Sequence, residues 1–199
     1  MQQIYPPANC PACGSILEWE KDQLFDPLDV YNEILESYAN KYELTSDEVE
    51  EYMKRIAFHE TDWTEDPSMH QYEGGPGRGL FQFEIGKGKG AEVAIQRFRN
   101  FYKDNNPTLS RINIPSDFSL VPEDMQKALF LINLMKVENR EGQDVKANLA
   151  SAKSKGTSGL EDLWINYHWA GWKEDPASEP SRRQDFQRSM LEYNRRYNK

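Results

Sequence analysis

The chain has 199 residues, a mass of 23.2 kDa and a formal net charge of −9. This length fits one domain, and the acidic balance argues against nucleic acid or an anionic membrane as a generic ligand. No stretch approaches the ~20 apolar residues of a membrane span, and the first residues lack the basic start and apolar core of a signal peptide. We therefore expect no membrane span, and delivery by another route if the target lies outside the cytoplasm.

Residues 1–26 carry proline, glycine and polar residues and predict an irregular lead-in to a domain over 27–199. Cys10 and Cys13 lie there as Cys-Pro-Ala-Cys, which is half of a zinc ligand set, and the nearest histidine is His59. Reduced thiols or a local disulfide are the favoured interpretation. A metal site and redox chemistry remain the alternatives.

Two amphipathic helices are expected next. In residues 27–40, Pro27 suits a first helical turn, and Val30, Ile34 and Tyr38 share one face. A second helix starts with Thr45, three residues before Glu48, in the pattern of a capping box. Its apolar positions recur at i, i+4, i+7 and i+8, and the next residue on that face is polar: Val49, Met53, Ile56, Ala57 and then Glu60.

Glycines punctuate residues 61–88, which predicts turns and a small β-hairpin with Leu80–Ile85 as its most strand-like part. The remainder predicts helices over 90–104, 122–137, 160–169 and 181–197, with a polar loop over 153–159. The expected core residues of these helices are Val93, Phe98, Phe101, Met125, Leu129, Ile132, Met135, Phe186, Met190 and Tyr193. The fold class is therefore mainly α, with a small glycine-rich β lobe.

Glu60 is the most informative residue of the chain. It ends an apolar helical face just before a glycine-rich turn, as expected of a lone carboxylic acid held at the edge of a cleft. Burial beside aromatic residues would keep such an acid protonated near neutral pH and able to protonate a leaving group.

Three segments together resemble the lysozyme-like superfamily, specifically lytic transglycosylases related to goose-type lysozymes. His59-Glu60-Thr61 resembles the Glu-Ser pattern of their catalytic glutamate, and Gly79-Leu80-Phe81-Gln82-Phe83 resembles their Gly-Leu-Met-Gln-Ile segment. Asn166-Tyr167-His168-Trp169-Ala170-Gly171 resembles their Ala-Tyr-Asn-Ala-Gly segment, with one extra residue. The variant is most similar to lysozyme domains of tailed-phage virion proteins.

The resemblance implies a lysozyme-like fold in which Glu60 acts as acid and then base on the MurNAc–GlcNAc bond of peptidoglycan, with no cofactor and no metal. Thr61 would orient Glu60, and Gln82 and Tyr167 would contact sugar. The full set of expected substrate-binding residues is Thr61, Gln82, Tyr167, Gly79, Phe83 and His168. It also implies action in the host periplasm or cell wall from a phage virion, with tail or internal virion proteins as candidate partners.

Two rival functions stay open. A muramidase would need a second carboxylate about 5–10 Å from the acid, for which Asp66, Glu73 or Glu84 are the candidates. A non-catalytic virion or wall-binding protein would keep the fold without turnover.

Three weaker signals favour ordinary structural roles. Gly86–Gly90 is rich in glycine and lysine but lacks the ending of a phosphate-binding P-loop. The three histidines, His59, His70 and His168, form no zinc-binding spacing. The arginines of 181–197 indicate a solvated helix face more than a binding patch.

Overall fold

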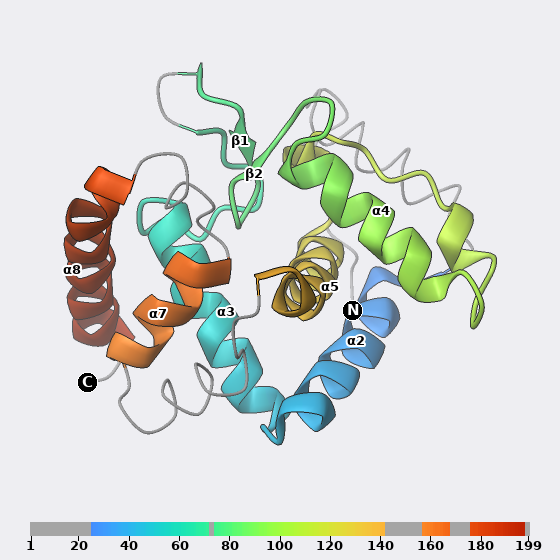
Figure 1. The fold of residues 1–199 in the computed structure, drawn as a ribbon, viewed down its shortest axis with the longest axis horizontal. Coiled ribbons are helices and arrows are strands. Elements are labelled where there is room, and N and C mark those ends of the chain that lie inside the picture. Colours follow the sequence, from blue (N-terminus) through green and yellow to red (C-terminus); the bar gives the residue numbers. More distant parts are fainter. Residues whose placement is uncertain (1–24, 72–73, 142–156, 168–175, 198–199) are drawn as a thin grey trace, which may run out of the picture.

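The computed structural model describes residues 25–71, 74–141, 157–167 and 176–197. These form helices and one two-stranded sheet (Figure 1), so the expectation of a mainly α protein is confirmed at that level. The lead-in to residue 24, with Cys10 and Cys13, lies outside the described residues. Within the described residues, no helix is long and apolar enough to cross a membrane.

Helices α2 (Pro27–Tyr42) and α3 (Ser46–Glu60) follow the sequence pattern closely. Asp26 caps α2 by accepting a hydrogen bond from Leu28 N at 2.9 Å. Thr45 and Glu48 form the predicted capping box of α3, with each side chain bonded to the other residue's backbone N–H. Both helices bury their apolar face, and α3 ends on Glu60 as predicted.

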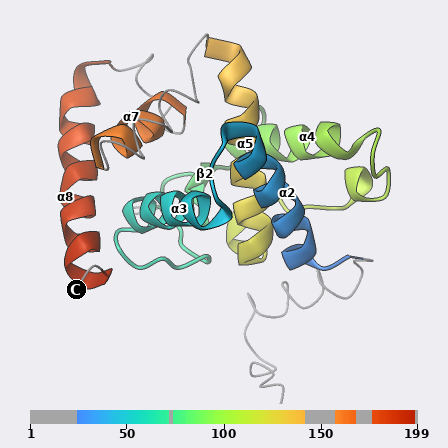
Figure 2. The ribbon, with the colours of Figure 1, turned by 90° about the horizontal axis from the view of Figure 1, so that it is seen from below.

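Helix α5 (Glu123–Glu141) lies at the centre of the larger part of the molecule, seen nearly end-on in Figure 1. Helices α2 and α4 (Gly90–Tyr102) pack against it, and Figure 2 shows α2 lying across α5. The predicted core residues of α5 are buried, as are Phe98 of α4 and the three expected core residues of 181–197. Val93 and Phe101 are only partly buried.

Helices α7 (Thr157–Tyr167) and α8 (Glu179–Tyr197) form a second layer. Helix α8 lies on the far side of α3 from α4, and α7 overlaps α3 in the view of Figure 1. Helix α8 packs against both α3 and α7. The predicted polar loop over 153–159 is shorter than expected, because α7 already begins at Thr157; residues 153–156 lie outside the described part.

The β lobe is smaller than the sequence predicts. Strands β1 (Gly77–Arg78) and β2 (Phe83–Glu84) pair antiparallel, and Leu80, Phe81 and Gln82 form the turn between them. Leu80, Phe81 and Phe83 point into the core instead, and Phe81 stacks on Phe130 of α5 at 4.0 Å between ring centroids. Burial of these three side chains, rather than a long ladder, fixes the lobe.

Gln126 of α5 pins this lobe to the helical core. It is 1% exposed; its Oε1 accepts from Leu80 N at 2.8 Å, and its Nε2 lies 2.8–2.9 Å from the carbonyl oxygens of Pro67, Phe118 and Val121. One buried amide thus satisfies backbone groups of three separate loops.

We predict that Gln126→Ala destabilises the protein by about 3 kcal/mol, because it leaves buried backbone groups without partners. Urea denaturation followed by circular dichroism measures the change. Gln96→Ala, on the exposed face of α4, is the matched control and should change stability by less than ~0.5 kcal/mol. Equal losses in both variants would contradict the role of Gln126.

Stability should also fall at alkaline pH. Burial raises the pKa of Tyr31, Tyr102 and Tyr193 above the ordinary 10.0, reinforced by the neighbouring carboxylates of Glu50, Glu33 and Glu51 respectively. A raised folded-state pKa gives stability that is complete below the unfolded value and is lost as pH rises above it. In an absorbance titration these three of the 10 tyrosines should ionise only together with the loss of helical signal; ionisation of all tyrosines in a still-folded protein would contradict this.

Candidate catalytic site at the end of helix α3

The carboxyl group of Glu60 is held by an indole from a distant part of the chain. Glu60 is partly buried, and its Oε1 accepts a hydrogen bond from Trp164 Nε1 of α7 at 2.5 Å. Trp164 is only 3% exposed. Such a contact fixes the direction of one carboxyl oxygen at the point where α3 ends, a preorganised arrangement for a group that transfers protons.

Aromatic rings lock Trp164 in place. Its indole stacks on Phe186 of α8 at 5.2 Å between centroids, and the edge of the His59 ring meets it at 4.6 Å. These ring arrangements contribute beyond area burial. Trp164 therefore has little freedom to leave Glu60.

An ion-pair network joins α7 to α8 next to Trp164. Arg183 of α8 bonds to Glu161 and Asp162 of α7, both at 2.8 Å, and to Glu179 at 2.8 Å. These hydrogen bonds raise the pKa of the Arg183 guanidinium against the opposing effect of burial. Gln187 adds a hydrogen bond to Glu161, which is itself 5% exposed. The network fixes α7 and with it the position of Trp164.

The residues on either side of Glu60 are anchored on α8 through Ser189. The Ser189 hydroxyl donates to Asp185 O, lies 2.9 Å from His59 Nδ1 and accepts from Trp63 Nε1 at 3.1 Å. Because that hydroxyl has only one hydrogen, His59 donates from Nδ1. This buried serine thus holds both flanks of the helix end.

Thr61 has a structural role. It is fully buried; its hydroxyl donates to Ala57 O at 2.7 Å and accepts from Glu65 N at 2.8 Å. In this structure Thr61 has no surface to offer a substrate, because no part of its side chain reaches solvent. Thr61 instead closes the end of α3 and shapes the turn that follows Glu60.

Gln82 and Gly79 together form a tight turn. Gln82 has φ +47°, and its Nε2 donates to Gly79 O at 2.8 Å, so the amide folds back on its own loop. Gly79 has φ +75°, and a Cβ there would lie 2.3 Å from Gln126 Oε1. Only glycine meets both conditions. Both residues were expected to bind substrate; here each serves the turn.

Phe83 is 4% exposed and packs on Phe118 at 5.1 Å between centroids, so its expected sugar contact is also wrong: the ring belongs to the core. Tyr167 ends α7, but its side chain lies outside the described part of the structure, as do His168 and the rest of the Ala-Gly segment. Glu60 and Trp164 are thus the described centre of the site. Sequence reasoning missed Trp164, because nothing local marks it as a partner of Glu60.

The candidate second carboxylates have other partners. Asp66 caps a turn by accepting from Ser68 N and Oγ, and Glu84 pairs with Lys89 at 3.3 Å. Glu73 lies outside the described residues. These contacts assign Asp66 and Glu84 to the architecture of the lobe.

The weaker sequence signals have local structural roles too. His70 contacts Ser119 while His59 contacts Ser189, and no metal-binding group of side chains exists among the described residues. In Gly86–Gly90, Gly88 N donates to Glu92. On α8, Arg188 pairs with Asp185, and Arg195 and Arg196 pair with Glu192.

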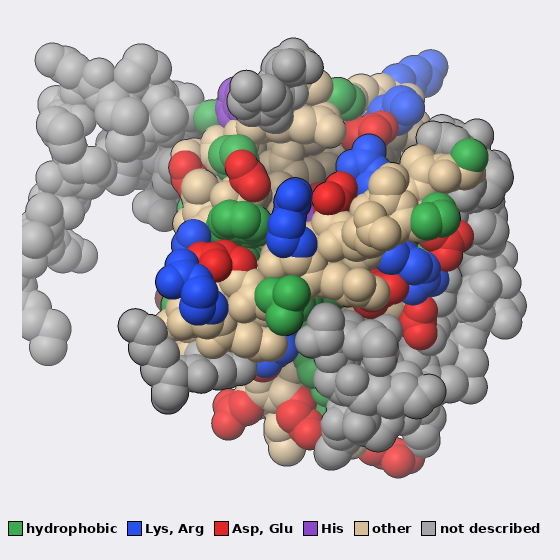
Figure 3. Space-filling model, turned by 90° about the vertical axis from the view of Figure 1, so that its left-hand side faces the viewer, with side chains coloured by type: hydrophobic (Ala, Val, Ile, Leu, Met, Phe, Trp, Pro, Cys, Tyr) green, Lys and Arg blue, Asp and Glu red, His purple; other side chains and the backbone are tan. Residues whose placement is uncertain are grey.

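These arginine pairs agree with a solvated helix face, and Figure 3 shows both signs of charge interspersed on that side of the molecule. Hydrogen bonds from the two arginines lower the pKa of Glu192 to about 2. The positive charge of α8 is thus largely balanced on the helix itself.

Comparison of the chain with known protein families, curated proteins and solved structures found no match.

The Trp164–Glu60 contact predicts a specific nuclear magnetic resonance signature. The chain has 5 tryptophans, and the indole N–H resonance of Trp164 is assigned as the one missing from Trp164→Phe. Glu60→Gln should shift this resonance more than the other indole resonances, because the acceptor of its hydrogen bond changes. Ser189→Ala should instead shift the resonance that Trp63→Phe removes. An unmoved Trp164 resonance in Glu60→Gln would contradict the contact.

Proposed function

We propose that the protein is a lysozyme-like lytic transglycosylase that cleaves the MurNAc–GlcNAc bond of peptidoglycan. The observation that carries the proposal is Glu60 at the end of α3, with its carboxyl group held by the buried indole of Trp164. The motif resemblance around Glu60 supplies the reaction and the substrate.

In this mechanism one carboxyl group does the work twice. Glu60 gives its proton to the glycosidic oxygen, the bond from that oxygen to the sugar C1 breaks, and the leaving sugar departs as an alcohol. The Glu60 carboxylate then takes the proton of the C6 hydroxyl of the MurNAc whose C1 lost its bond. The C6 oxygen bonds to C1, which closes a 1,6-anhydro ring and restores protonated Glu60.

The position of the Glu60 carboxyl group matters because this one group must donate a proton in the first step and accept one in the second. The Trp164 hydrogen bond would keep one carboxyl oxygen fixed, while the buried Thr61 hydroxyl and the Ser189 anchor restrain the backbone around it. A group held this way avoids reorganisation during the reaction. No second carboxylate is required.

A non-catalytic wall-binding or virion protein is the second candidate. The observations that favour it are the Gln82 amide, turned onto Gly79, and the Thr61 hydroxyl, buried in the helix end. If the resemblance held at every residue, the Gln82 amide would contact sugar and the Thr61 hydroxyl would orient Glu60 or contact substrate. We keep phage virion delivery to the host periplasm or wall as part of the main proposal, on the resemblance alone.

Digestion of purified peptidoglycan, read by mass spectrometry of the released muropeptides, tests the proposal. Wild type should release products ending in 1,6-anhydro-MurNAc. Glu60→Gln keeps the shape but loses the proton donor, so its rate should fall about 10³-fold, the contribution of acid–base catalysis. Trp164→Phe should fall less, because the carboxyl remains but loses its anchor.

The controls separate the rivals. Glu36→Gln, an exposed position on α2, should release products at the wild-type rate. Reducing-end sugars that vanish in Asp66→Asn would replace the proposal by a muramidase. Binding of glycan without release, from several wall types, would make the protein a non-catalytic binder.

A further inference from the structure

A cavity lies near the end of α3, and Glu60 is not among the residues that line it. It has a volume of about 280 Å³ and is formed by α2, α3, the start of α5 and the turn of the β lobe. Ala57, one helical turn before Glu60, and Glu65, in the turn after it, both line the cavity. The volume is at the small end of ligand pockets, which suits one amino acid or a short peptide and not a run of sugars.

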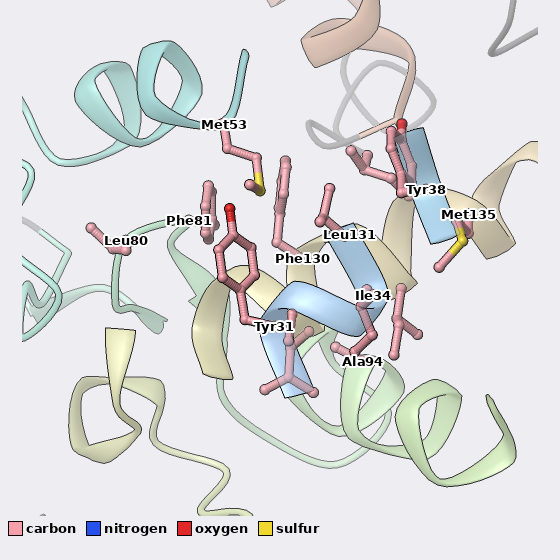
Figure 4. Close-up of a cluster of buried hydrophobic side chains, with 14 of the residues drawn as sticks. Tyr31, Ile34, Tyr38, Met53, Leu80, Phe81, Ala94, Phe130, Leu131 and Met135 are labelled. Atoms are coloured by element: carbon pink, nitrogen blue, oxygen red, sulfur yellow. The ribbon is translucent and has the colours of Figure 1, made fainter. Parts of the chain in front are cut away.

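The cavity has an apolar wall on one side. Figure 4 shows Tyr31 of α2, Met53 of α3 and Phe81 of the β lobe pointing toward one another, and all three line the cavity. Leu80 and Ala57 also line it. These five side chains are 1–5% exposed, so they offer the chain of a ligand a small apolar contact and not an open aromatic face.

Five charged residues line the cavity, and two of them form an ion pair with each other. Lys127 bonds to Glu123 at 2.7 Å, so these two charges neutralise each other within α5. The other three are Glu50, Glu65 and Lys54. The Glu65 carboxylate accepts a hydrogen bond from the Tyr197 hydroxyl at 2.5 Å, which leaves its charge unbalanced. The cavity thus has two carboxylates and one ammonium group whose charges no ion pair balances among the described residues.

Glu50 and Lys54 are spaced at i and i+4, an arrangement that normally forms an ion pair on a helix. No ion pair joins them in the described structure. Glu50 accepts instead from the Tyr31 hydroxyl at 3.0 Å, and the Lys54 ammonium lies 4.2 Å from the centre of the Tyr197 ring. The two opposite charges are thus held apart on the cavity rim by aromatic side chains.

We propose that this cavity binds a free diamino acid. The carboxylate of the ligand would pair with Lys54, its two ammonium groups with Glu50 and Glu65, and its methylene chain would lie on Met53, Phe81 and Ala57. This arrangement matches each unbalanced charge of the cavity and its apolar wall.

A diamino acid within the peptide of a glycan strand carries only one ammonium group, because its α-nitrogen is an amide. The proposal therefore concerns the free amino acid, and it stands independently of the proposed function.

Calorimetric titration of the full chain with L-lysine tests the proposal. Given the small size of the ligand, we expect a Kd of about 1 mM. L-norleucine keeps the chain and lacks the side-chain ammonium; 1,5-diaminopentane keeps both amines and lacks the carboxylate. Each should bind about tenfold more weakly, since each loses one charged contact.

Two variants locate the contacts. Glu50→Gln should weaken L-lysine binding about tenfold. Lys54→Met should weaken L-lysine but leave 1,5-diaminopentane unchanged, because that ligand has no carboxylate to lose. Glu36→Gln and Lys103→Met, at exposed positions outside the cavity, are the matched controls, and thermal melting verifies that each variant folds.

Equal affinity for L-lysine and L-norleucine, or no heat with any of the three ligands, would overturn the proposal. So would a Lys54→Met variant that binds all ligands as wild type does. Glu60→Gln should bind L-lysine normally, so inactivity on peptidoglycan with intact lysine binding would reject the proposed function and keep the cavity assignment.

Discussion

The burial of the middle of α5 on every side is the constraint from which the rest of the fold follows. Leu129, Phe130, Leu131 and Ile132 are consecutive, and all four are fully buried. Four consecutive helical positions span the whole circumference, so this part of the helix leaves no face for water. Other elements must therefore cover it, which α2, α4 and the aromatic residues of the β lobe do.

That requirement explains why so small a β lobe keeps a defined shape. Two residue pairs of sheet would be unstable alone, but Phe81 and Phe83 insert against Phe130 of α5, and Gln126 satisfies the backbone of the same turn. The positive φ angles at Gly79 and Gln82 are tolerated because these contacts hold the turn on both sides. The lobe is in effect an extension of the helical core.

The end of α3 depends on the second layer in the same way. Helix α8 supplies Phe186 and Ser189, α7 supplies Trp164, and the Arg183 network holds the two helices together. Glu60, the aromatic cluster and the charged cavity beside Ala57 thus occupy neighbouring faces of one short helix. Trp164 of α7 orients the Glu60 carboxyl group on one face of α3, and the cavity lies on a different face.

The sequence by itself determined the local features: the capping box at Thr45, the apolar face that leads to Glu60, and the central apolar helix around Leu129. These follow from periodicity and from contacts between residues three or four apart, which a single segment contains. Only the tertiary structure decided what each side chain contacts. Trp164 donates to Glu60 across 104 positions of the chain. The Gln82 amide donates to Gly79 O, and Glu50 accepts from Tyr31 and forms no ion pair with Lys54. Such choices depend on which helices lie side by side, and no spacing along the chain encodes that.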